Sequence, residues 1–558
     1  MMTSAWTSPW LLPLAALFPL LLAALPAIPA LRRHQLHLLP IAAIPALWAG
    51  LFVPDEATVT LTHALMESTW TMDHLGRVFQ LFTAFGWLVA GLFSISYLRD
   101  HPRKGPFAIP FLLAMSGNLL LPTAADAVTF YTGFGVMSFA SWGLVVHAGT
   151  PEARRAGRVY MTLVLLGELM VFPGLVKGTL WAESSLLSAI RTHWTLDPDP
   201  RFQIALIFFG FALKAGLFPF HFWLPLAHPA APAPASAVLS GCMIKAGLLA
   251  WLRLLPLGEF AMPILGQTIT LLAGTSMIGA LVIGLTQTHP KALLAYSSLS
   301  KMGMMMLLLA PAMIEPQLAP AAIAAVLVYA TFHSLHKSAL FLGTALPPSR
   351  GKTGLMILLC ASFAGLPFLS GALAKTSVKT LLDHPAFPNG QPFAPLFALS
   401  ALLTLLLMFR FLLLTQLRPS NSKPQAPSSQ LPAPHSALSW TLAVLAALLF
   451  PLLAQHFDLS TNPGYAYRPV TALTAEPALW GGLLLIAVWA IFKPKLPFHI
   501  PPGDLLNLLP RISRPWLARM ETLLEETETR LNGAPGGLAY LIITLLLVGL
   551  MVSFSALI

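Results

Sequence analysis

The residues best suited to chemistry in this sequence are ionisable side chains inside long apolar runs. They are Glu168, Lys214, His221, His228, Lys245, Lys301, His333, Lys337 and Lys375. A charge at the centre of a bilayer costs from roughly 2.5 to more than 10 kcal/mol, so each such residue indicates a function by default. Burial favours the neutral lysine and a nearby carboxylate favours the ammonium, so a small electrostatic change can load or unload a proton. The pattern predicts a relay that carries protons or other ions.

Some of these residues also have plain structural interpretations. A lysine near a span end can extend to the interface, and this alternative applies more to Lys301 and Lys375 than to the deeper residues. The histidines beside the Pro219 break, His221 and His228, either relay protons or hydrogen-bond a carbonyl. His333 lies four residues before Lys337, so the two share one helical face.

Composition places the chain in lipid. Hydrophobic residues make up 56% of the sequence and charged residues only 9%, with a mean hydropathy of +0.74. A soluble globular chain carries about a quarter charged residues. The net charge of +11 would suit nucleic-acid binding, but the basic residues lie in short loops between apolar runs, which is typical of membrane orientation. We therefore expect an all-α polytopic membrane protein with no nucleic-acid partner.

Apolar runs of about 20 residues, long enough to cross a bilayer, recur along the chain. About sixteen are expected, at 8–30, 36–53, 78–98, 107–124, 126–147, 158–180, 203–225, 236–256, 263–285, 291–313, 318–346, 354–382, 393–415, 438–454, 477–493 and 537–557. The first run is followed by Arg32 and Arg33 and has no basic residue before it, which favours a retained span over a cleaved signal peptide.

The charges between the runs predict orientation. Basic residues fall in every second loop, at Arg32, Arg33, Arg99, Arg103, Lys104, Arg154, Arg155, Arg158, Lys291, Arg350, Lys352, Arg418, Lys423, Lys493 and Lys495. Acidic residues collect on the other side, at Asp55, Glu56, Asp73, Asp126, Asp197 and Asp199. We expect a multi-pass protein of the cytoplasmic (inner) membrane with its amino terminus outside. The loops 99–104, 148–158 and 416–436 would then be cytoplasmic.

Four regions are expected along the chain. They are N-terminal transmembrane helices (1–106), a transporter core (107–415, with halves of about 107–256 and 263–415), a linker (416–436) and C-terminal transmembrane helices (437–558). The linker is rich in Pro, Ser and Gln, which indicates a solvated cytoplasmic segment. Between about 504 and 531 charged residues alternate with apolar ones at helical spacing, so an interfacial amphipathic helix or an ordinary surface helix is expected.

An internal echo indicates inverted repeats. Residues 215–220 read AGLFPF, and 364–368 read AGLPF five spans later. Because five is odd, two copies at that offset have opposite topology, as in inverted-repeat transporters. Both copies contain a mid-membrane proline that breaks the helix, and the freed carbonyls are tolerated only against protein or a wet cavity.

The sequence offers no pattern for a cofactor or metal site. Cys242 and Cys360 each lie in an apolar run without a CxxC or Cys/His cluster, so both are expected to be packing thiols. There is no GxGxxG motif after a strand and no metal-spaced set of Cys and His. We expect no cofactor and no metal on this chain.

Longer motifs carry a family resemblance over roughly residues 75–415. Residues 214–237 (KAGLFPFHFWLPLAHPAAPAPASA), 243–247 (MIKAG), 291–303 (KALLAYSSLSKMG) and 332–343 (FHSLHKSALFLG) carry it. They resemble the antiporter-like subunits of respiratory complex I, Mrp cation/proton antiporters and membrane-bound hydrogenases. The HPAAP run is most similar to the large membrane subunit of formate hydrogenlyase and hydrogenase-4.

The resemblance implies a fold and site roles. The fold would be a fourteen-helix core with two inverted five-helix repeats, each holding a broken helix. Lys214 would belong to the first half-channel, Lys245 and the His333/Lys337 pair to the central relay, and Lys375 to the end of the second half-channel. One departure concerns the fifth span, where the family has a glutamate and this chain has Gly135. Glu168 on the next span is the candidate replacement.

The leading hypothesis is a proton- or sodium-translocating subunit of an energy-converting oxidoreductase complex. Its redox chemistry would reside in other membrane and peripheral subunits. The alternatives are a subunit of an Mrp-type cation/proton antiporter, and a structural membrane module whose channel is inactive because a glutamate is missing at position 135.

Overall fold

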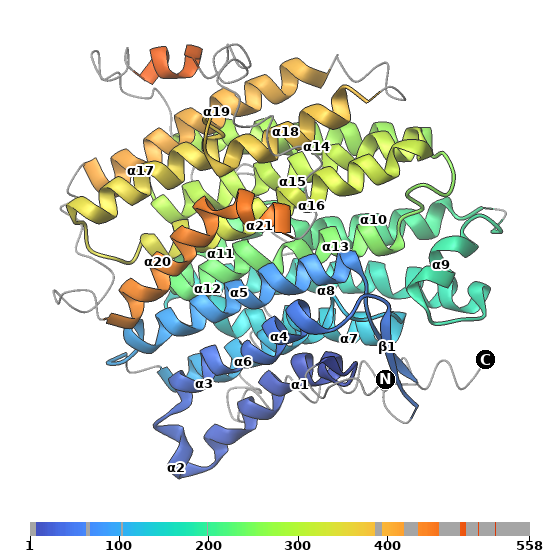
Figure 1. Cartoon of the computed structure of the whole chain (residues 1–558), viewed down its shortest axis with the longest axis horizontal. Helices are drawn as coiled ribbons and strands as arrows, with labels where there is room; N and C mark the ends of the chain where they lie inside the picture. Colours follow the sequence, from blue (N-terminus) through green and yellow to red (C-terminus); the bar gives the residue numbers. More distant parts are fainter. Residues whose placement is uncertain are drawn as a thin grey trace.

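The computed structural model describes residues 7–62, 67–101, 104–197, 199–384, 393–417, 434–456, 480–486, 500 and 519. These residues form a bundle of helices, with the N-terminal helices on one side and α14 to α19 on the other (Figure 1). Helix α20 runs back to pack against α5 and α16, so a segment far along the chain closes the middle of the bundle.

The first part of the bundle contains eight helices and one hairpin. They are α1 (Leu11–Ala24), α2 (Pro29–Arg32), α3 (Gln35–Ile41), α4 (Ile44–Phe52), β1 (Ala57–Leu61), β2 (Ser68–Met72), α5 (His74–Tyr97), α6 (Lys104–Leu120), α7 (Ala127–Val145) and α8 (Pro151–Ala182), with a 3₁₀ turn η2 (Leu25–Ala27). Side-chain caps fix three starts: Asp73, Asp126 and Thr150 accept the N–H of Gly76, Thr129 and Ala153.

The following helices carry most of the candidate site residues. They are α9 (Leu187–His193), α10 (Arg201–Ala215), α11 (Trp223–Ala230), α12 (Ala233–Val238), the π-helical turn η3 (Leu239–Met243), α13 (Lys245–Leu254), α14 (Pro263–Thr286), α15 (Pro290–Ile314), the 3₁₀ turn η4 (Pro316–Leu318), α16 (Ala319–Gly343), α17 (Arg350–Ala364), α18 (Ser370–Leu382), α19 (Ala394–Leu412), the π-helical turn η6 (Leu413–Leu417), α20 (Pro434–Leu448) and α21 (Phe450–His456).

The expected all-α polytopic class is confirmed. By length and composition, nine helical segments within the described residues can cross a membrane, and three shorter apolar helices lie at Leu11–Ala24, Gly105–Leu120 and His435–Leu448. These segments do not establish the expected total of sixteen membrane spans. The linker 416–436, the amphipathic segment 504–531 and the span 537–557 lie almost wholly outside the described residues, as does most of the span 477–493.

Two broken helices lie where the repeated motif predicts them. Helix α10 ends at Gly216 with φ of 71°, and α17 ends at Gly365 with φ of 80°. This left-handed conformation favours glycine, which explains why the AG pair recurs at both breaks. After each break the chain re-enters the bundle through α11 or α18.

A small antiparallel hairpin, β1 and β2, was not anticipated from the sequence. Asp126 ties it to α7 by accepting the N–H of Thr69 and of Thr129, each at 2.8 Å. Burial raises the pKa of the Asp126 carboxyl, although these two N–H bonds act against that. The hairpin was missed because its strands are only five residues long and lie between apolar runs.

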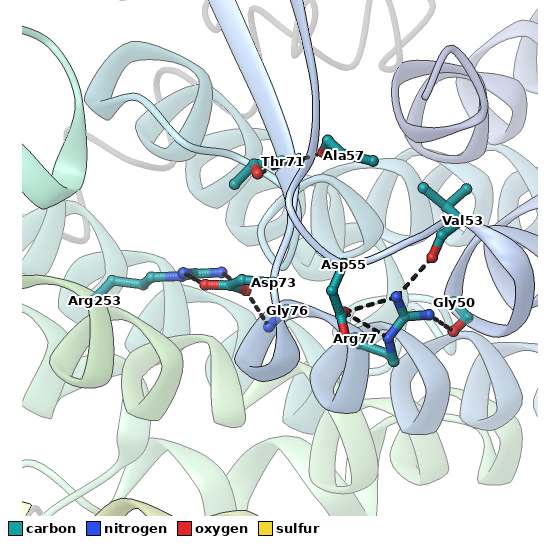
Figure 2. Close-up of polar contacts among 9 residues, drawn as sticks. All are labelled: Gly50, Val53, Asp55, Ala57, Thr71, Asp73, Gly76, Arg77 and Arg253. Atoms are coloured by element: carbon teal, nitrogen blue, oxygen red, sulfur yellow. Dashed lines mark hydrogen bonds and ion pairs between the residues drawn. The ribbon is translucent and has the colours of Figure 1, made fainter. Parts of the chain in front are cut away.

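Paired charges lie beside the hairpin (Figure 2). Arg253, near the end of α13, bonds both carboxylate oxygens of Asp73, with Nη2 to Oδ1 at 2.8 Å. Arg77 bonds Asp55 at 2.7 Å. Burial would raise the pKa of Asp73, but Arg253 and the Gly76 N–H outweigh it and hold that pKa below its ordinary value. These two arginines depart from the expected charge asymmetry, and both are neutralised by the acidic residues expected there.

Candidate functional site

The first group of site residues lies where α8 meets α7 and α10. Lys214, the last lysine before the first break, is 3% exposed and donates to the Tyr160 hydroxyl at 2.9 Å. Tyr160 in turn donates to the Ser138 carbonyl at 2.9 Å. Its ring also faces the ammonium, whose Nζ lies 5.2 Å from the ring centroid. Lys214 is therefore a buried lysine whose hydrogen bond goes to a phenol.

Glu168 is the carboxylate that the sequence analysis proposed as a partner for Lys214. The fold brings it into the same group. It is 4% exposed and lies within electrostatic range of Lys214. Neither of its oxygens forms a hydrogen bond with the described residues. Helices α8 and α10 approach closely here, because a Cβ on Gly167 would lie 2.9 Å from the Gly210 carbonyl oxygen. The hydroxyls of Tyr131 and Ser138 are its polar neighbours, so a carboxyl in this position can exchange a proton.

Gly135 faces the same space as Glu168. Tyr131 and Ser138, which lie next to the Glu168 carboxyl, are four residues before and three residues after Gly135 and so share its helical face. A Cβ at position 135 would meet only one atom within 4 Å, Cε2 of Phe139 at 4.0 Å. A Cβ at position 135 therefore fits without overlap, on the helical face that carries Tyr131 and Ser138.

The central group begins at Lys245, the first residue of α13. Its ammonium donates to the carbonyls of Ser240 and Gly241 at 2.9 and 2.7 Å. The π-helical turn frees the first of these, because the Ile244 N–H bonds the Leu239 carbonyl five residues back. The hydroxyl of Ser240 contacts that of Ser298 on α15 at 2.7 Å.

Lys337 on α16 meets the same turn of α15. Its ammonium donates to the Leu294 carbonyl at 2.9 Å and to the Ser297 hydroxyl. Ser298 also donates to the Leu294 carbonyl, at 3.0 Å. Lys245 bonds the carbonyl of Ser240, and the hydroxyl of the same residue begins the contacts through Ser298 and Leu294 that reach Lys337. The two lysines are thus linked from η3 across α15 to α16 by way of the Ser240 residue itself.

His333 and Lys301 lie beside this connection. His333 is fully buried and lies within electrostatic range of Lys245, Lys301 and Lys337. Within the described residues, neither of its ring nitrogens has a hydrogen-bond partner. Lys301 is 3% exposed and donates to Thr404 of α19 at 3.0 Å, so it is buried in the bundle and does not reach the interface.

The remaining candidates lie at the two breaks. Lys375 lies over the second break, since a Cβ on Gly365 would come within 2.9 Å of the lysine Nζ. At the first break, His221 stacks on Phe218 with ring centroids 5.1 Å apart and lines a small pocket. His228 is fully buried and stacks on Phe341 at 4.4 Å. His228 is held by packing, so it is not brought into the polar contacts that join Lys245 to Lys337.

Sequence reasoning missed the hydroxyls that connect the lysines. Tyr160, Ser240, Ser297 and Ser298 are each buried and each contacts a candidate residue or its partner. The signal was present in the YSS run at 296–298, since consecutive serines inside an apolar span need internal partners. Among the described residues, no group of three or more His, Cys, Asp or Glu is placed to hold a metal ion.

The fold and the buried ionisable groups define a membrane protein of the antiporter-like class. Residues 124–354 match the family described as NADH:quinone oxidoreductase/Mrp antiporter, TM. Over these residues the chain is similar to the antiporter-like subunits shared by complex I, hydrogenase-4 and the Mrp antiporters.

Two relatives and one solved structure illustrate the similarity. Hydrogenase-4 component B of Escherichia coli (strain K12) is 29% identical over 325 residues, which cover 55% of this chain and 47% of the relative. The Na(+)/H(+) antiporter subunit A1 of Staphylococcus saprophyticus is 28% identical over 411 residues, 65% of this chain and 50% of the relative. The chain thus spans about half the length of these relatives.

The solved structure is the Mrp complex from Dietzia sp. DQ12-45-1b. The superposition has a TM-score of 0.73 at 22% identity and covers 98% of this chain and 63% of the matched chain. At this identity the likeness confirms the fold and does not extend to activity.

Proposed function

We propose that this chain translocates protons, or sodium ions, as a membrane subunit of a larger energy-converting oxidoreductase complex. The observation that carries the proposal is the connection between Lys245 and Lys337 through the hydroxyl of Ser298 and the carbonyl of Leu294. Two buried lysines joined by polar groups have no packing advantage over apolar residues, since each must be desolvated. An ion relay would explain why both lysines are buried there.

Each candidate has a role in this relay. Lys214 and Glu168 form the first half-channel, with Glu168 as the carboxylate that tunes the lysine. Lys245, His333 and Lys337 form the centre, and Lys375 ends the second half-channel. Lys301, His221 and His228 lie beside this relay and support ion exchange with it.

The relatives supply the expected setting. Those described above include a component of hydrogenase-4 and a subunit of an antiporter. We place this chain in the cytoplasmic membrane with its amino terminus outside, among other membrane subunits and with redox groups on peripheral subunits. A second candidate, a subunit of a Mrp-type cation/proton antiporter, is favoured by the 28% identity to the Na(+)/H(+) antiporter subunit.

One experiment separates these functions. The chain is purified from its membrane in mild detergent, every co-purifying subunit is identified, and the assembly is reconstituted into liposomes with pH- and sodium-sensitive dyes. Redox subunits and electron-driven ion uptake support the proposal, whereas small membrane subunits and gradient-driven exchange support the antiporter. An assembly whose ion flux is unchanged when both Lys214 and Lys245 are replaced contradicts both and leaves an inactive structural module.

A further inference from the structure

A second hydrogen-bonded chain begins at His336 on α16 and runs to α17 and α18. His336 Nδ1 contacts the Phe332 carbonyl at 2.9 Å, and its Nε2 contacts the Ser362 hydroxyl at 2.9 Å. The Ser362 hydroxyl contacts that of Ser370 at 2.7 Å, and Ser370 contacts the Ala447 carbonyl at 2.7 Å. The three side chains are at most 1% exposed.

Counting hydrogens shows that this hydrogen-bonded chain is one hydrogen short when His336 is neutral. Besides a longer contact of 3.4 Å between His336 Nε2 and the Ser370 hydroxyl, its four shorter contacts run between two carbonyl oxygens that only accept, so four hydrogens are needed to satisfy those four. Each serine supplies one, and a neutral imidazole supplies one, which gives three. An imidazolium supplies two, and every contact is then made at once, from His336 to both neighbours and onward to Ala447. The geometry therefore matches the charged histidine and leaves the neutral one with a contact that has no hydrogen.

The fold holds the hydrogen-bonded chain of His336, Ser362 and Ser370 tightly at the second broken helix. Ser362 lies near the end of α17 and Ser370 begins α18, on the two sides of the break at Gly365. A Cβ on Gly371 would overlap the Ser362 carbonyl oxygen at 1.8 Å, so only glycine permits this approach. The Ala447 carbonyl comes from α20, the helix that returns to the centre of the bundle.

Nearby charges limit when the imidazolium can form. On α16 itself, Lys337 and His333 both lie within electrostatic range of His336. Helix α17 contributes the buried thiol of Cys360, and α18 contributes Lys375 at the break. In α20 the only titratable side chain is His435 at its exposed start. A proton on His336 is thus opposed first by the full burial of the ring and then by protons on Lys337 and His333.

We propose that His336, Ser362 and Ser370 form a site that holds one excess proton. The imidazole takes it up at Nε2, which then donates to the Ser362 hydroxyl, while the Ser362 hydrogen turns from Nε2 to Ser370. As a branch of the relay between Lys337 and Lys375, the site rests on the proposed function. Because Lys337 opposes its charge, the proton leaves the central lysine before or as this site fills. The site can bind a proton without any redox partner.

The first test measures the protonation state directly. The full-length assembly with ¹⁵N-labelled histidine is placed in lipid nanodiscs, and imidazolium signals are followed by solid-state NMR between about pH 5 and 8. His336→Asn identifies the signal by its loss, and His435→Gln serves as the exposed control. Ser370→Ala shortens the chain to two contacts and two hydrogens, which a neutral imidazole satisfies. We expect it to weaken proton binding roughly tenfold, seen as a midpoint about one pH unit lower.

The second test measures ion-coupled activity. His336→Asn and Ser370→Ala should each reduce it severalfold, whereas Ser377→Ala, whose hydroxyl bonds its own helix at Ala374, should not. A His336 that stays neutral over the whole pH range, or has the same midpoint in Ser370→Ala, overturns the site. Full activity in both variants, while Lys245→Ala is inactive, overturns the branch and leaves the proposed function standing. An active Lys245→Ala contradicts the proposed function, and the NMR measurement still decides the site.

Discussion

The Lys245 ammonium donates to the carbonyl of Gly241 at 2.7 Å, so this buried cation is held by the backbone of its own segment. With the bond to Ser240, two of its three hydrogens are used. A neutral amine retains two N–H groups and can keep both bonds. The lysine can therefore lose a proton without leaving a buried carbonyl unsatisfied, which is what a reversible carrier requires.

Replacing Lys214 or Lys245 with alanine should reduce ion-coupled activity of the assembly at least tenfold, because the ammonium is a carrier. Abundance of the Lys214 variant should change little, because Tyr160 keeps its bond to the Ser138 carbonyl. The Lys245 variant also loses the partner of the Ser240 carbonyl, so its flux is divided by its subunit yield. Flux into liposomes and subunit yield are measured together. Lys379→Ala, an exposed lysine of α18, is the matched control. Normal coupling in both variants would leave only the structural interpretation.

Glu168→Gln should impair coupling about as strongly as loss of Lys214, because a buried lysine without an anionic neighbour stays neutral. Adding Gly135→Glu should restore part of the activity. The open space beside position 135 and its position on the face of Tyr131 and Ser138 allow a carboxylate to reach the same group. The readout is dye-monitored flux of the single and double variants. A fully active Glu168→Gln protein would show that Glu168 is no replacement.

Asp73→Asn should lower thermal stability, because it leaves Arg253 without its counter-charge. Hydrogen bonds to charged groups contribute about 1.5–3 kcal/mol each. The pKa of Asp73 lies below its ordinary value, so its contribution is fully present above that ordinary pKa and is lost as the pH falls through the lower folded value. Thermal unfolding in detergent at neutral pH provides the measurement. Asp199→Asn, an exposed aspartate whose nearest cation is 3.9 Å away, should cause almost no shift.

Single-cysteine labelling tests the orientation. Arg154→Cys is expected to be protected from an impermeant maleimide in intact cells, and Asp199→Cys to react. Both positions are exposed, and the two native cysteines are buried, so background labelling should be low. The reverse pattern would require a different number of spans before residue 154.

Periodicity and motifs predicted the helices, the two breaks and the burial of Lys214, Lys245, Lys301 and Lys337. Lys375 is only partly buried. A break needs glycine in a left-handed conformation, and the repeated AG pair carries that signal. The π-helical turn before Lys245 and the serine contacts around Ser298 were not predictable in the same way. They depend on which faces of α13, α15 and α16 meet, and the register between distant helices is absent from any local pattern. The His336 chain is hidden for the same reason, since its members come from α16, α17 and α18.

The length of helix α8 can be compared with the thickness of a membrane. Its 32 residues span about 48 Å, well beyond a hydrocarbon layer of about 30 Å. The two basic residues Arg158 and Lys177 lie about 28 Å apart along it, which matches the thickness of that layer. Glu168 falls about 15 Å from Arg158, at half depth. In a hydrocarbon layer bounded by Arg158 and Lys177, the Glu168 carboxyl lies near the middle, where water is scarcest.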